Sequence, residues 1–298
     1  MQMEKIPLFC KSYHHDVLRA KRLVESIETF NADKLPLYLS VPAADIALFK
    51  DKIGVGRCNW VADEDISRAN PRHSVEDISR IDGGLAQQVI KSEFWRLQPC
   101  AAYLCLDSDS VFIRDFYLAD FIASDGVPYT TLHQCKDYLQ LALNLGKVQV
   151  VRDFNRDSAS GRKLFERFGP EYDFGPTPVV WSSRVWQDLS TNFLEPRDWT
   201  MLDAIKHYPA ELRWYGEALL AYKSIPLHPV EPLFRVYHTD WQYFALKKQG
   251  EKIATLREKY MGVVLQSNWE YEMNFSNSGK SVLSRVARKF KRQLKRLV

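Results

Sequence analysis

Short apolar runs alternate with longer segments whose apolar residues recur every three or four positions over the first hundred residues. The runs predict buried strands at 6–10, 35–41, 59–62 and 101–106. The periodic segments predict helices at 17–30, 43–52 and 85–97. This alternation is typical of a parallel sheet with right-handed crossover connections. Beyond residue 125 the pattern is less regular, and we predict one α/β domain over residues 1–273.

Composition and cysteine usage narrow the class of protein. Of the 298 residues, 46% are hydrophobic and 26% are charged, values typical of a globular protein. The longest apolar runs are far shorter than the roughly 18–20 residues of a membrane-spanning helix. The N-terminus lacks the apolar region of a secretory signal, and the five cysteines include no CxxC pair. These features predict a cytoplasmic protein without a disulfide framework or a zinc cluster.

The basic charge is concentrated at the C-terminus. Eight of the 41 Lys and Arg residues lie in 280–298, which has no Asp or Glu. Without these eight, 33 basic residues face 37 acidic ones, so the body carries a net charge of −4. Because the body is acidic, we expect no nucleic-acid partner. The tail's apolar residues recur at helical spacing and predict a basic amphipathic helix: Leu283, Val286, Phe290, Leu294 and Leu297.

Such a helix suits an anionic membrane surface, where each basic residue contributes about 1 kcal/mol. A solvated helix packed on the domain and a nucleic-acid arm are the alternatives for this tail. Residues 274–279 predict a linker, so the second unit of the chain is 274–298. We therefore expect a peripheral protein at the inner face of the cell membrane.

The segment Leu104-Cys105-Leu106-Asp107-Ser108-Asp109 carries the most chemistry. Its two carboxylates follow a buried strand, at the sheet edge where α/β proteins bind ligands. In an extended segment, residues two apart point to the same side, so Asp107 and Asp109 can approach one divalent cation. Mg²⁺ and Mn²⁺ bind through such carboxylates together with substrate phosphates. A solvated turn is the plain structural alternative.

An apolar strand, a DxD motif and a second apolar strand at 111–113 resemble the metal-binding element of GT-A glycosyltransferases. The segments Gln87-Gln88-Val89-Ile90-Lys91, Tyr103 to Asp109 and Glu211 to Gly216 are also similar to an uncharacterised bacterial family of this kind. The resemblance covers about residues 6–240. It implies a Rossmann-like, mixed but mainly parallel sheet flanked by helices. It also implies transfer of a sugar from a nucleotide diphosphate-sugar to a bacterial polysaccharide, lipopolysaccharide or lipid-linked acceptor, with Mn²⁺ or Mg²⁺ as cofactor.

The resemblance also implies roles for single residues. Asp109 is expected to bind the metal, and Asp107 either shares it or binds the donor ribose. His238 is the candidate third metal ligand, although a buried structural histidine is an equal alternative. The candidate donor-binding residues lie in three segments: Lys11, Ser12, Tyr13, Gln88, Lys91 and Ser108.

An inverting transfer needs a general base, for which Glu211 is preferred over Glu217. A retaining enzyme needs no such base, and the residues do not distinguish the two outcomes.

Two other functions fit parts of the sequence. The segment 107–111 also resembles the motif of haloacid dehalogenase-type phosphatases, with Asp107 as nucleophile and Asp109 as acid/base. In those proteins the motif usually opens the domain, whereas about a hundred residues precede it here. The second alternative is a non-catalytic nucleotide-sugar-binding protein that has kept the fold.

Overall fold

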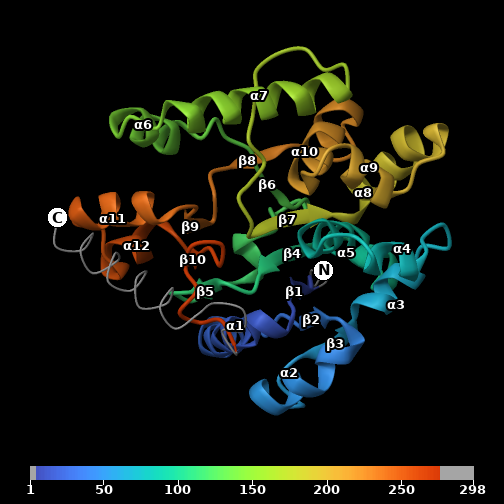
Figure 1. The fold of residues 1–298 in the computed structure, drawn as a ribbon, viewed down its shortest axis with the longest axis horizontal. Coiled ribbons are helices and arrows are strands. Elements are labelled where there is room, and N and C mark those ends of the chain that lie inside the picture. Colours follow the sequence, from blue (N-terminus) through green and yellow to red (C-terminus); the bar gives the residue numbers. More distant parts are fainter. Residues whose placement is uncertain (1–4, 276–298) are drawn as a thin grey trace.

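A five-stranded sheet forms the centre of the molecule in a computed structural model that describes residues 5–275 (Figure 1). The strand order is β3-β2-β1-β4-β7. Four strands are parallel: β1 (Leu8–Lys11), β2 (Leu37–Val41), β3 (Asn59–Ala62) and β4 (Ala102–Asp107). The edge strand β7 (Val179–Ser182) is antiparallel to β4. The predicted mixed, mainly parallel sheet is therefore confirmed.

Helices cover both faces of this sheet and divide the core in two. On one face lie α1 (Val17–Phe30) and α2 (Ile46–Ile53). The other face is covered by α3 (Asp63–Arg68), α4 (Val75–Ser79), α5 (Gly83–Leu97), α8 (Ser183–Leu189), α9 (Met201–His207) and α10 (Glu211–Tyr222). The strands are apolar on both sides because Leu8 and Cys10 face the first core and Phe9 faces the second.

Helix α5 begins two residues earlier than its apolar pattern predicts. The Asp82 carboxylate accepts a hydrogen bond of 2.8 Å from the Gly84 backbone N–H and caps the helix. The glycine pair therefore forms the first turn of α5 rather than preceding it. This turn lies at the same sheet edge as the DxD segment, where Gly83 and Gly84 line a cavity of about 860 Å³.

A second, three-stranded sheet follows the DxD segment. It has the order β5-β10-β9, with β5 (Ser110–Phe112), β9 (Phe234–Tyr237) and β10 (Gly262–Leu265). A side chain at Gly262 would place its Cβ 1.9 Å from the Phe234 ring and 2.5 Å from the Val111 carbonyl oxygen. Glycine thus permits the close approach that brings β10 beside β5. The helices α11 (Asp240–Lys248) and α12 (Ile253–Lys259) connect β9 to β10.

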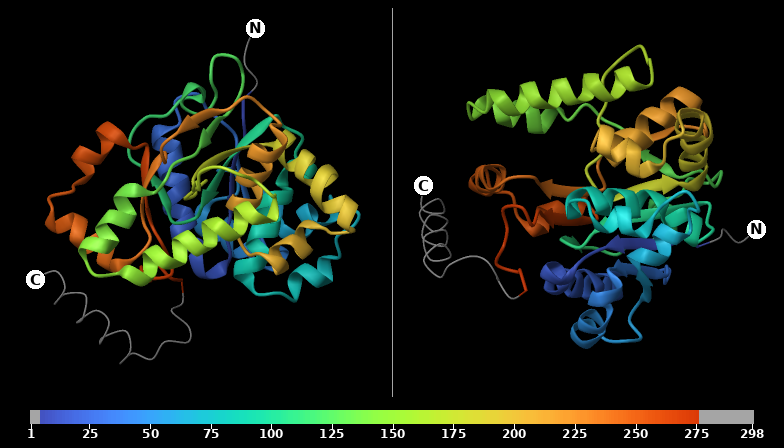
Figure 2. Two further views of the ribbon diagram at one scale, coloured as in Figure 1. Left: turned by 90° about the horizontal axis from the view of Figure 1, so that it is seen from above. Right: turned by 45° about the vertical axis from the view of Figure 1, so that its right-hand side comes forward.

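The least regular part of the sequence forms an arm over the second face. Helices α6 (Lys136–Asn144) and α7 (Val148–Leu164) pack side by side and extend along one side of the molecule (Figure 2). They are preceded by β6 (Tyr129–Thr131), which pairs in parallel with β8 (His228–Val230).

The described chain ends on helix α1. The Phe275 backbone N–H donates a 2.8 Å hydrogen bond to the His15 carbonyl oxygen, and the Asn274 side chain accepts a bond from Arg19. The chain thus stays packed on the domain two residues into the predicted linker. The rest of that linker and the predicted basic helix at 280–298 lie outside the described residues. Within residues 5–275, no helix combines the length and the apolar character needed to cross a membrane.

Candidate active site

The carboxyl ends of the parallel strands meet at one edge of the main sheet, and a cavity of about 860 Å³ opens there. Lys11, at the end of β1, is in register with Ser40 of β2 on one side and with Asp107 of β4 on the other. The volume of this cavity is typical of pockets that bind small molecules. The predicted donor-binding residues all line this cavity: Lys11, Ser12, Tyr13, Gln88, Lys91, Asp107 and Ser108.

A buried lysine joins two of the predicted carboxylates. The Lys91 ammonium contacts an Asp107 carboxylate oxygen at 2.5 Å and a Glu211 oxygen at 3.7 Å. Burial alone would lower the pKa of Lys91, but the Asp107 and Glu211 carboxylates raise it above its ordinary value. Gln88 adds a further link, because its side-chain oxygen accepts a 3.3 Å bond from the Glu211 backbone N–H at the start of α10. This network joins α5, β4 and α10.

Asp109 is buried and only partly satisfied. One carboxylate oxygen accepts a 2.9 Å hydrogen bond from the Ser267 backbone N–H, just after β10. The other oxygen is buried with no hydrogen-bond partner among residues 5–275, and the same holds for the Ser12 hydroxyl. Burial, reinforced by the nearby Asp107 carboxylate, raises the pKa of Asp109 to about 7. This oxygen is therefore available to a ligand that enters the cavity, because none of residues 5–275 occupies it.

The cavity is strongly acidic. Its lining includes eight carboxylates but only two lysines. Both lysines are already engaged: Lys91 as described, and Lys11 in an ion pair of 3.0 Å with Asp63. Burial raises the pKa of Asp63, although Lys11 opposes this. The remaining carboxylates leave an excess of negative charge that a divalent cation would compensate.

The donor atoms available fit a hard cation. The unpartnered oxygen of Asp109 and the carboxylate of Asp107 are the type of ligand that Mg²⁺ and Mn²⁺ prefer. The Ser267 backbone N–H orients Asp109 by donating a hydrogen bond to the other carboxylate oxygen. The side chains at this edge of the sheet are thus compatible with the predicted metal site, with Asp109 as the central ligand.

The structure does not bring His238, the predicted third ligand, into this group. His238 follows β9 and lines a second cavity, of about 680 Å³, rather than the one that contains Asp109. Its ring centroid lies 5.0 Å from that of Tyr138, and burial lowers its pKa. The reason is the strand order: β10 lies between β9 and β5, so Ser267 instead of His238 reaches Asp109.

Glu217, the second candidate general base, does not line this cavity either. Its side chain is 1% exposed, and both carboxylate oxygens accept bonds from the Arg167 guanidinium, at 2.5 and 3.1 Å. A carboxylate held in this fork has no access to a substrate hydroxyl. Glu211, six residues earlier on the same helix, lines the cavity instead. Burial raises the pKa of Glu211, with the Lys91 ammonium opposing the shift.

The sequence analysis missed several residues of the cavity. Asp63 directly follows β3, so its position after an apolar run was a usable signal. Asp82 caps α5 and precedes the glycine pair, and an aspartate in that position was a second usable signal. The segment 266–268 gave no such signal, because it reaches the site only through the pairing of β10 with β5.

The fold is shared with solved glycosyltransferases. The structure of mouse xyloside xylosyltransferase 1 in its apo form matches with a TM-score of 0.51 at 9% identity, covering 90% of this chain and 99% of that one. The apo structure of the bifunctional glycosyltransferase WbbM matches with a TM-score of 0.50 at 11% identity, covering 99% of this chain and 52% of that one. At such identities the likeness establishes the fold alone.

The sequence comparisons give a family without an assigned activity. No protein with a curated function matches the chain. Residues 4–270 match the sequence model of a family of unknown function, DUF6492. Because this match spans most of the sequence, the chain belongs to the DUF6492 family.

Proposed function

We propose that this protein is a metal-dependent glycosyltransferase that uses a nucleoside diphosphate-sugar donor. The observation that carries the proposal is the buried, unpartnered oxygen of Asp109 in an acidic cavity at the carboxyl edge of the sheet. The glycosyltransferase fold supports it, and favours sugar transfer over the phosphatase alternative.

The charge of the cavity explains why a cation is required. A diphosphate would be repelled by the eight carboxylates of the lining, which Lys11, Lys91 and the Arg19 paired with Asp16 offset only in part. Asp109 and Asp107 would hold Mn²⁺ or Mg²⁺, which when bound stabilises the negative charge on the leaving nucleoside diphosphate. Lys91 orients Asp107 for this task, because its ammonium fixes one of the two carboxylate oxygens.

The remaining residues divide between donor and acceptor. Tyr13 is 42% exposed at the rim of the cavity, and we assign it to stacking on the nucleobase. The Ser12 hydroxyl and the Gln88 amide offer polar contacts to the donor. Glu211 is the candidate general base, because it lines the cavity and burial raises its pKa, which makes the carboxylate a stronger proton acceptor.

We further propose that the acceptor is a saccharide or lipid-linked saccharide of a bacterial surface polymer. The basic tail at 280–298 supports this assignment, since an anionic membrane surface would bring the enzyme to such an acceptor. The location would then be the cytoplasmic face of the membrane.

The test is binding of nucleoside diphosphates by calorimetry, with Mn²⁺ or with a chelator. We expect binding that requires the metal and that weakens at least ~10-fold in Asp109→Asn, equivalent to about 1.4 kcal/mol. Asparagine keeps the oxygen that Ser267 contacts, so the fold should persist. Asp51→Asn is the matched control, because this carboxylate is 68% exposed and outside the cavity. Equal affinity in Asp109→Asn would refute the metal assignment.

Turnover then separates the classes of enzyme. Release of free nucleoside diphosphate from a panel of nucleotide sugars supports a transferase. Hydrolysis of an aryl phosphate without such release would favour the phosphatase, and tight donor binding without either reaction would favour the non-catalytic alternative.

A further inference from the structure

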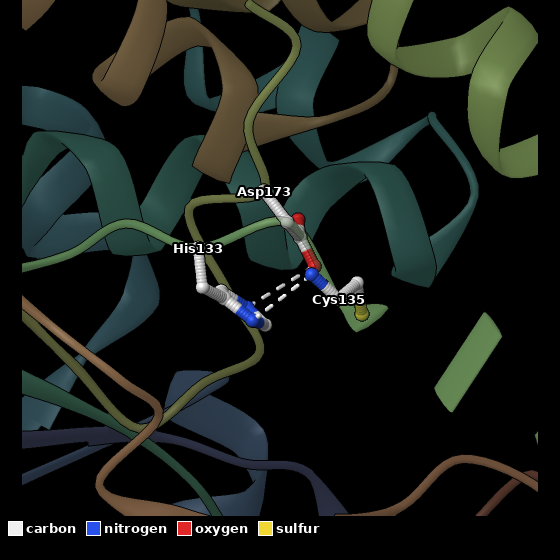
Figure 3. A group of neighbouring side chains, drawn as sticks. All are labelled: His133, Cys135 and Asp173. Carbon is white, nitrogen blue, oxygen red and sulfur yellow. Dashed lines mark hydrogen bonds and ion pairs between the residues drawn. The ribbon is translucent and has the colours of Figure 1, made fainter. Parts of the chain in front are cut away.

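A second group of ligand-type side chains lies at the other cavity, away from the DxD segment. Potential ligand atoms of His133, Cys135 and Asp173 all lie within 4.8 Å of one another. Figure 3 shows these side chains gathered between the segment that follows β6 and the segment that leads to β7. All three are largely buried, and His133 and Cys135 line the cavity of about 680 Å³.

The backbone holds the two segments together. The His133 N–H donates to the Asp173 carbonyl oxygen at 3.1 Å, and the Asp173 N–H donates back to His133 at 2.8 Å. Cys135 adopts a left-handed conformation, with a φ of 55°. The positions of the three side chains are therefore set by a paired backbone rather than by two independent loops.

The histidine is oriented as a ligand would be. Its Nε2 lies 2.6 Å from the Gly175 carbonyl oxygen, which can only accept a hydrogen bond, so Nε2 carries the proton. Nδ1 is then left with a lone pair, which a long 3.3 Å bond from the Cys135 backbone N–H engages. An Asp173 carboxylate oxygen lies 3.6 Å from Nε2, so this side chain would have to turn toward Nδ1 to share a cation with it. Histidines that bind metals commonly donate their other ring N–H to a backbone carbonyl, which fixes the tautomer.

A fourth ligand is within reach. A Glu231 carboxylate oxygen lies 3.7 Å from His133 Nδ1, and its side chain is 79% exposed and free to adjust. Arg235, in the lining of this cavity, is paired with Glu251 at 2.8 Å. Arg213 is paired with Asp157 at 2.6 Å, and its charge also interacts with the Asp173 carboxylate, so a bound cation would share Asp173 with this guanidinium. The cluster therefore brings together one nitrogen, one sulfur and two carboxylates.

We propose that His133, Cys135, Asp173 and Glu231 bind a borderline divalent cation of the Zn²⁺ type. Tetrahedral sites for Zn²⁺ combine imidazole, thiolate and carboxylate ligands, whereas Mg²⁺ and Mn²⁺ prefer oxygen. Binding releases the thiol proton of Cys135, which forms the metal–sulfur bond as a thiolate. The ion would clamp residues 133–135 onto 173–176, next to Thr177 in the wall of the donor cavity. Its role is structural, and it is chemically distinct from the oxygen-ligand site at Asp109.

Cobalt substitution gives a readout that does not depend on activity. The full chain is stripped with a chelator, dialysed and titrated with Co²⁺. We expect one equivalent to produce a thiolate-to-cobalt band in the near ultraviolet and tetrahedral bands in the visible, both of which Zn²⁺ displaces. Cys135→Ser should abolish the near-ultraviolet band and weaken Zn²⁺ binding at least ~10-fold. Cys58→Ser, at a half-buried cysteine elsewhere, should change neither.

A second variant guards against a folding defect. Asp173→Asn keeps the backbone pairing with His133, and we expect it to retain the fold but to bind Zn²⁺ at least ~10-fold more weakly. Absence of a thiolate-to-cobalt band in the wild-type protein would overturn the proposal, as would unchanged Zn²⁺ affinity in Asp173→Asn. Asp109→Asn should leave the cobalt spectrum intact, which separates this site from the proposed donor site.

Discussion

At the scale of single residues, two glutamates of one helix differ because of their neighbours. Glu211 begins α10 and lines the cavity beside Lys91, whereas Glu217 does not line the cavity and forms an ion pair with Arg167. Both are buried, so exposure does not separate them. What separates them is the partner: the Lys91 ammonium is shared with Asp107, while the Arg167 fork occupies both oxygens of Glu217.

This difference predicts that replacement of each glutamate by glutamine affects a different property: turnover at position 211 and stability at position 217. Glu211→Gln should lower turnover of the nucleotide sugar by about 10²-fold with little change in stability, since it removes the candidate base. Glu217→Gln should lower the free energy of unfolding by about 3 kcal/mol, because Arg167, whose side chain is 11% exposed, loses its counter-charge. Urea unfolding and steady-state kinetics on both variants check this. A stable, inactive Glu217→Gln would restore that residue as the base.

At the scale of elements, β10 completes the site from a distance in sequence. Its pairing with β5 carries Ser267 to the carboxylate of Asp109, and its pairing with β9 keeps His238 at the second cavity. The close packing depends on Gly262, where a Cβ atom would meet both the Phe234 ring and the Val111 carbonyl oxygen.

Gly262→Ala should therefore destabilise the protein by about 1–3 kcal/mol, because the added methyl group forces the small sheet apart. It should also weaken metal-dependent nucleotide binding, since β10 positions Ser267. Gly56→Ala is the matched control, because a Cβ atom there meets nothing within 4 Å. Urea unfolding measures the difference. If the two variants unfold at the same urea concentration, the packing argument at β10 fails.

At the scale of the whole molecule, the sequence divides its charge between an acidic body and a basic tail. The acidic cavity lies in the body, and the tail carries the expected affinity for a membrane. The two functions are thus expected to be separable.

Deleting residues 280–298 should lower co-sedimentation with vesicles rich in anionic lipid by more than ~10-fold at low salt, because eight basic residues are lost. Neutral vesicles are the control, and added salt should weaken binding of the full chain. The melting temperature and metal-dependent nucleotide binding of the shortened protein should match those of the full chain. Undiminished sedimentation would show that the tail is not the anchor.

The sequence by itself determined the four parallel strands of the main sheet, their polar ends and the carboxylate pair at the end of β4. These features are local: an apolar run gives a buried strand, and the carboxyl ends of parallel strands share one edge, so Lys11, Asp107 and Asp109 were found together. The tertiary structure alone decided which distant side chains join them. Ser267 reaches Asp109 across 158 residues and Arg167 reaches Glu217 across 50, because strand order and helix packing set such pairs. No local pattern of apolar and polar residues encodes contacts of that range, so the sequence did not show that His238 and Glu217 lie outside the donor cavity.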